Sequence, residues 1–65
     1  MKLRKMEIPE VQIIQNEMVN KKISMQDVAR NNGIFISKLQ QVLSGKATVT
    51  QDKIDRIIKY VTQHD

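Results

Sequence analysis

The chain has 65 residues, a formal net charge of +4 and no cysteine. A chain of this length makes one small domain with a thin core, and the lack of cysteine excludes disulfides and thiolate zinc sites as supports for that core. The excess of lysine and arginine favours a polyanionic partner and disfavours an acidic mimic of DNA. No apolar run is long enough for a membrane span or a signal peptide, so we expect a cytoplasmic protein with no membrane partner.

The first eight residues are basic and alternate weakly between apolar and charged side chains. We expect residues 1–8 to form a basic N-terminal arm and residues 9–65 to form a single domain. Three interpretations of the arm stay open: a solvated terminus, an arm that contacts phosphates or a minor groove, and a short strand that pairs with its copy in a dimer.

The next residues predict two helices, over residues 9–20 and 24–32. Pro9 suits the first turn of a helix, where its missing N–H has no partner to lose. Apolar residues then recur at helical spacing at Val11, Ile14 and Met18. Ser24 is a good N-cap for the second helix, and Gly33 ends it because glycine adopts the left-handed conformation without a Cβ clash.

The second half of the chain predicts two more helices, over residues 36–44 and 51–62. The inward stripe of the earlier one consists of Leu39, Val42 and Leu43. Thr50 caps the later one, whose inward residues are Ile54, Ile57, Ile58 and Val61. The sequence therefore predicts an all-α bundle of four short helices, with no strand except the weak alternation near the N-terminus.

The spacing between Met25 and Ser44 is typical of a helix-turn-helix. Ala29 is small where two helices would cross, and Gly33 takes the turn four residues later. Apolar residues that would hold the second helix of the unit against the first are Val28, Ile34, Leu39 and Val42. The combination is more specific than any one apolar match, and it predicts a helix-turn-helix.

Residues 23–62 resemble the headpiece of the lactose-repressor family without a gap. The matching blocks are Asp27-Val28-Ala29-Arg30, Gly33-Ile34, Val42-Leu43-Ser44-Gly45-Lys46 and Val49-Thr50. In that family the helix-turn-helix comes first, whereas here a complete helix precedes it, which is similar instead to phage lambda repressor and Cro-like domains. Both families belong to one broad fold group, so the resemblance implies a lambda-repressor-like bundle.

The resemblance makes residues 36–44 the recognition helix, which enters the major groove. It places four side chains against base edges: Ile36, Ser37, Gln40 and Gln41. Glutamine can bond both N6 and N7 of adenine, and isoleucine can contact a thymine methyl, so we expect an A·T-leaning site in double-stranded DNA. Contacts with the DNA backbone are implied for Ser24, Lys38, Ser44, Lys46, Thr50 and Lys53.

Two positions depart from the family pattern. Phe35 stands where the family has a Ser or Thr that caps the recognition helix, so a capping bond worth about 1 kcal/mol is absent. Phe35 could fold over the small core, meet a second subunit or another protein together with Ile36, or contact thymine. Lys38 is the only cation of the recognition helix, which has no arginine for the commonest contact with guanine.

These features together favour a small transcriptional regulator of bacterial or phage type that acts as a repressor in the cytoplasm, associated with the nucleoid. We expect a homodimer, because one reading helix rarely gives enough affinity. The alternative is a helix-turn-helix redirected to protein binding, an antirepressor or coregulator that docks through Phe35 and Ile36. The residues indicate no enzyme, cofactor or metal site, since the only histidine, His64, has no cluster of ligands around it.

Overall fold

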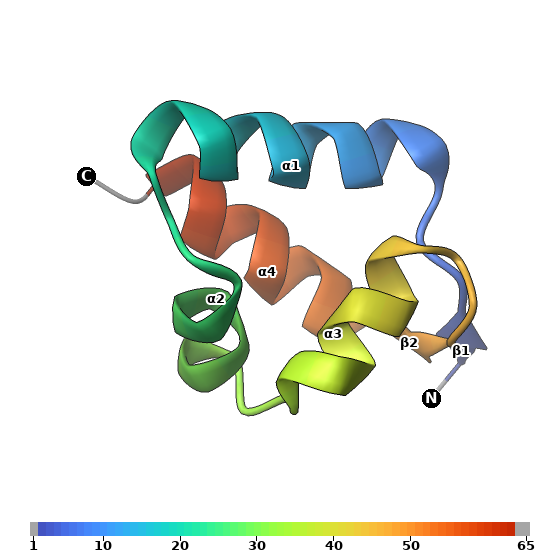
Figure 1. The fold of residues 1–65 in the computed structure, drawn as a ribbon. Coiled ribbons are helices and arrows are strands. Elements are labelled where there is room, and N and C mark those ends of the chain that lie inside the picture. Colours follow the sequence, from blue (N-terminus) through green and yellow to red (C-terminus); the bar gives the residue numbers. More distant parts are fainter. Residues whose placement is uncertain (1, 64–65) are drawn as a thin grey trace.

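The computed structural model describes residues 2–63, which form four helices and one small sheet (Figure 1). In chain order the elements are β1 (Leu3–Arg4), α1 (Ile8–Lys21), α2 (Met25–Asn31), α3 (Ile36–Leu43), β2 (Val49–Thr50) and α4 (Gln51–Gln63). The predicted all-α bundle of four short helices is confirmed, and each helix begins and ends within one residue of its predicted bounds. His64 lies outside the described residues.

The core lies between α1 and α4, which run beside each other in Figure 1, and it extends down to α2 and α3. Ile14 of α1 is fully buried, as are Ile54, Ile57 and Val61 of α4, while Ile58, which was also predicted to face inward, is half-buried. Removing each of these side chains from water contributes about 1.5–3 kcal/mol to folding, and this contribution offsets the entropy lost in ordering the helices.

The C-terminal end of α1 also stabilises the C-terminal end of α4. The Lys21 ammonium group donates hydrogen bonds to the carbonyl oxygens of Val61 (3.0 Å) and Thr62 (2.8 Å). It also forms an ion pair with Glu17 (2.9 Å), one turn earlier in α1. A cation at this position satisfies carbonyls that have no partner within α4 and complements the negative end of its dipole.

The first residues of the chain pair with a segment far along the sequence. Strand β1 is antiparallel to β2, with Leu3 opposite Thr50 and Arg4 opposite Val49. Met6, between β1 and α1, is buried in the core. These residues are therefore part of the folded domain, in contrast to the expected N-terminal arm, and the strand pairs with β2 of the same chain.

Arg4 holds this end of the molecule together. Its guanidinium group binds both carboxylate oxygens of Glu10 in α1 (2.9 and 2.7 Å) and donates to the side-chain oxygen of Gln51 in α4 (2.6 Å). The Glu10 carboxylate also accepts the backbone N–H of Glu7 (2.9 Å). Hydrogen bonds from Arg4 lower the pKa of Glu10 below its ordinary value of 4.5, because they favour the charged form.

Replacing Glu10 with Gln tests this contact. We expect Glu10→Gln to lower the free energy of unfolding at pH 7 by about 0.5–1 kcal/mol, the range for a partly exposed ion pair. Because the folded-state pKa of Glu10 is lowered, its contribution is complete above pH 4.5 and is lost as the pH falls through that lowered pKa. Urea denaturation of both proteins from about pH 7 to pH 2 should show the difference shrinking. A constant difference at every pH would contradict this account.

Candidate nucleic-acid interface

Helices α2 and α3 form a compact unit around one tight turn. Ser24 caps α2, since its hydroxyl accepts the N–H of Asp27 (3.1 Å), as predicted. Ala29 is buried, and its carbonyl accepts the N–H of Ile34 just beyond the turn (3.0 Å). Gly33 has a φ of 63°, the left-handed conformation predicted for it. The turn therefore holds α3 at a defined angle to α2.

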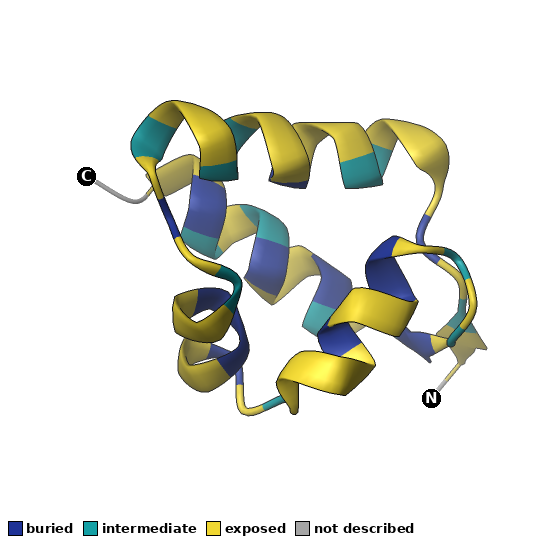
Figure 2. Cartoon of the chain, in the orientation of Figure 1, coloured by how far each residue is buried: buried dark blue, intermediate teal, exposed yellow. Residues whose placement is uncertain are grey.

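Helix α3 has one buried and one exposed face, as Figure 2 shows by colour. Leu39, Val42 and Leu43 are buried in the core. The exposed face carries all four side chains implied for base contacts, Ile36, Ser37, Gln40 and Gln41. Ile36 and Gln40 are four positions apart, as are Ser37 and Gln41, so the residues form two adjacent rows on one side of the helix. The structure therefore brings the predicted base-contacting residues together on a single exposed face.

Phe35 is the N-cap residue of α3 and lies on the surface. Its side chain is 84% exposed, so the interpretation in which it folds over the core is wrong. The backbone explains this position: Phe35 is extended, with φ −69° and ψ 144°, and its carbonyl accepts the first helical N–H, that of Leu39 (2.9 Å). Together with Ile36, which is 40% exposed, it forms an apolar patch at the N-terminus of α3.

Each hydroxyl implied for contacts with the DNA backbone forms a hydrogen bond at the end of a helix. Thr50, which is half-buried, accepts the N–H of Lys53 at the start of α4 (3.3 Å), and Ser24 plays the same role in α2. A hydroxyl that accepts still has its own O–H to donate, so both residues keep a donor for a phosphate. Ser44 is exposed, but its hydroxyl already donates to the carbonyl of Gln40 (2.6 Å).

The three lysines implied for backbone contacts differ in their surroundings. Lys38 and Lys46 are exposed. Lys53 is half-buried, and its ammonium group donates to the carbonyl of Asn32 in the turn between α2 and α3 (2.8 Å). An ammonium group has three donors, so Lys53 both supports the turn and keeps positive charge next to it.

A further electrostatic feature was missed in the sequence reasoning, although the sequence contains it. The segment 28–51, which includes all of α3, has three cations, Arg30, Lys38 and Lys46, and no aspartate or glutamate. Every acidic residue of the chain lies before or after this segment. The chain therefore carries only positive side-chain charges between Asp27 and Asp52, the segment that contains α3.

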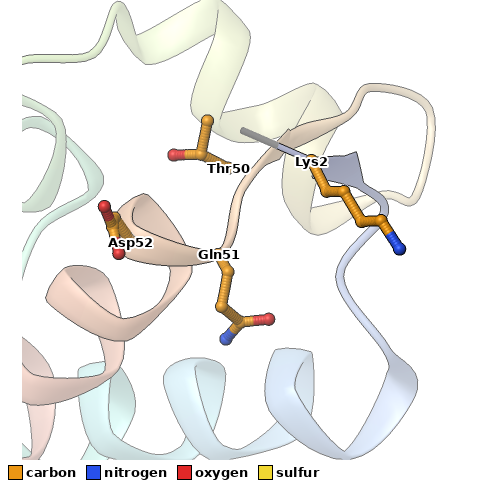
Figure 3. Close-up of a pocket in the computed structure, with 4 residues that line it drawn as sticks. All are labelled: Lys2, Thr50, Gln51 and Asp52. Carbon is orange, nitrogen blue, oxygen red and sulfur yellow. The ribbon is translucent and has the colours of Figure 1, made fainter.

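A pocket of about 160 Å³ lies beside the start of α4, lined by Lys2, Thr50, Gln51 and Asp52. In Figure 3 the ammonium end of Lys2 extends away from Thr50 and Asp52, so the polar groups do not converge on one point. Within residues 2–63, no three His, Cys, Asp or Glu side chains are grouped as metal ligands. Over the same residues, no helix is both long and apolar enough to cross a bilayer.

The exposed N-cap position leads to a stability prediction. We expect Phe35→Ser to raise the free energy of unfolding by about 0.5–2 kcal/mol, because serine can accept an N–H in the first turn of α3 and little buried surface is lost. Thermal or urea denaturation measures the change. Phe35→Ala, which removes the ring without adding a cap, is the control and should be close to neutral. A loss of stability in both variants would mean that the ring contributes to the core.

Comparisons of the chain with protein-family models, with curated proteins and with solved structures find no match. The residues of α3 and of the turns that flank it are therefore the features of the chain that indicate a function.

Proposed function

We propose that the chain is a small transcriptional regulator that binds double-stranded DNA by placing α3 in the major groove as the second helix of a helix-turn-helix. The observation that carries this proposal is the exposed face of α3, where Ile36, Ser37, Gln40 and Gln41 lie together on a helix held by the core. A rigid helix with a polar outer face can enter the major groove and read base edges there.

The chemistry of this face favours an A·T-leaning site. Gln40 and Gln41 each have an amide that can donate to N7 and accept from N6 of adenine, and Ile36 can contact a thymine methyl. Ser37 can donate or accept a hydrogen bond. The face has no arginine, so guanine is not the preferred base.

Groups on both sides of α3 can hold the DNA backbone. Lys46 follows the C-terminal end of α3 and Lys38 lies on it, while the hydroxyls of Ser24 and Thr50 stand at the starts of α2 and α4. Helix starts present free N–H groups and a positive dipole end, which favour phosphate. No acidic side chain lies between residues 28 and 51, so the only carboxylates in the first turns of α2 and α4 are those of Asp27 and Asp52.

We further propose that the regulator acts as a homodimer and as a repressor in the cytoplasm, associated with the nucleoid. A single α3 offers few base contacts, and pairing two copies on a site with two-fold symmetry multiplies them. Repression needs only occupancy of the site, whereas activation needs an additional surface that recruits polymerase.

The second candidate function is protein binding through the patch of Phe35 and Ile36. The observation that favours it is the 84% exposure of Phe35, an aromatic ring of the kind that anchors protein interfaces. In this function the chain is an antirepressor or coregulator, and the patch docks on a larger DNA-binding protein or on polymerase.

Selection from a random, A+T-rich pool of duplex DNA tests the first function. We expect an enriched site with two-fold symmetry and an affinity that falls steeply between about 50 and 200 mM salt. Gln41→Ala should cost about 1–3 kcal/mol at one base pair, and Lys46→Ala should weaken binding to all sequences and reduce the salt slope by about 1. Gln63→Ala, at the far end of α4, is the matched control and should leave binding unchanged.

The outcomes separate the two functions. Absence of binding at about 50 mM salt would overturn the DNA proposal, and binding without sequence enrichment would overturn its sequence specificity. A chain that docks on a protein should instead bind its partner more weakly after Phe35→Ala, and Gln41→Ala should have little effect on that interaction.

A further inference from the structure

The outer surface of α1 carries no charge. The charged residues of this helix, Glu10, Glu17 and Lys21, are half-buried, and each forms an ion pair with Arg4 or within the helix. Every exposed residue of α1 is apolar or carries an amide. In a chain with 28% charged residues, a helix surface of this composition is unusual for one that faces only water.

The other long helix shows the contrast. The exposed side of α4 carries both signs of charge, with Asp52, Asp55, Arg56 and Lys59. On α1, by comparison, Ile8 is 73% and Val19 is 77% exposed. Depletion of charge together with exposed aliphatic side chains is the composition found at the centre of protein interfaces.

Four of these residues form a stripe with two-fold character. Ile8, Gln12, Gln15 and Val19 are spaced by four, three and four positions, so they follow one line along the helix. The order of residue types is the same from either end: aliphatic, amide, amide, aliphatic. An antiparallel copy of the helix would place Ile8 opposite Val19 and Gln12 opposite Gln15, with complementary groups at every pair.

We propose that this stripe is the interface through which two copies of the chain associate, with their α1 helices antiparallel about a two-fold axis. Charge supports a second copy as the occupant, because two chains of net charge +4 repel each other wherever exposed lysines or arginines meet. The uncharged stripe lets them approach without such contacts. Its amides pair with each other, and its aliphatic ends bury one another.

The size of the contact sets its strength. A helix of 14 residues is about 20 Å long, so one helix against another buries far less than the roughly 800 Å² per partner of a standard interface. The dimer is therefore weak, with a dissociation constant on the order of 100 µM.

All residues of this stripe belong to α1, so the interface uses none of the exposed residues of α3. This inference rests on the proposed function in one respect: it names the surface through which the proposed homodimer forms. Its test contains no DNA, so its failure and the failure of DNA binding are distinguishable.

Sedimentation from about 10 µM to 1 mM tests the association. We compare the chain with an acidic variant, Gln12→Glu with Gln15→Glu, and a basic variant, Gln12→Lys with Gln15→Lys. Each variant alone should raise the dimer dissociation constant about tenfold or more, because like charges meet across the axis. An equimolar mixture of the two should restore the dimer. These glutamines are exposed, and circular dichroism checks that both variants fold.

The matched control carries the same charges on other helices, at Gln26 and Gln63, which are also exposed glutamines. Acidic and basic control variants should change the dissociation constant much less, and mixing them should have no specific effect. A monomeric chain at about 1 mM, or control variants as disruptive as the test variants, would overturn the proposal.

Cysteine cross-linking tests the antiparallel arrangement, and the chain has no cysteine of its own to interfere. A mixture of Ile8→Cys and Val19→Cys chains should form a disulfide-linked heterodimer under mild oxidation. Ile8→Cys alone should cross-link much more slowly, because its two thiols would lie about 16 Å apart along the helices. Equal rates for Ile8→Cys alone and for the mixture would overturn the arrangement.

Discussion

The apolar stripe of α4 is the support on which the other elements depend. Ile54, Ile57 and Val61 are fully buried, and the helix packs against α1, contacts α2 and follows directly from β2. Helix α3 reaches this core through Leu39 and through its packing against α2. The direction of the candidate DNA-binding face is thus set indirectly, by residues that never reach the surface, and a core defect in α4 would disturb a surface two helices away.

The helices could be predicted from the sequence because their signals are local. The period of apolar residues, the caps at Ser24 and Thr50 and the turn at Gly33 each act within a few residues. The same locality explains why the exposed face of α3 was predicted: once the buried stripe of a helix is known, the opposite face follows from geometry.

The remaining features depend on contacts between distant residues. The weak alternation near the N-terminus allowed a short strand but not its partner: Leu3 and Arg4 pair with residues 49–50, and Arg4 also contacts Glu10 and Gln51. The exposure of Phe35 does not follow from its residue type, because a large apolar side chain in a small protein favours burial. Here the extended N-cap backbone directs it outward, and local geometry outweighs the hydrophobic preference.

Net charge alone gives an incomplete account of this surface. Three of the cations form bonds that stabilise the fold: Arg4 joins β1 to α1 and α4, Lys21 caps α4, and Lys53 supports the turn before α3. The exposed cations in the segment 28–51 are Arg30, Lys38 and Lys46, and this segment contains no acidic residue. The distribution of charge therefore says more about a polyanionic partner than its total does.

The position of α4 in the chain has a consequence for biosynthesis. Helices α1, α2 and α3 precede it, yet α1 and α2 pack on its apolar stripe and β1 pairs with the residues directly before it. A nascent chain without α4 lacks the helix against which α1 packs, so we expect Ile14 to stay exposed until α4 has been made. We therefore expect the complete core to form only after α4 has been made.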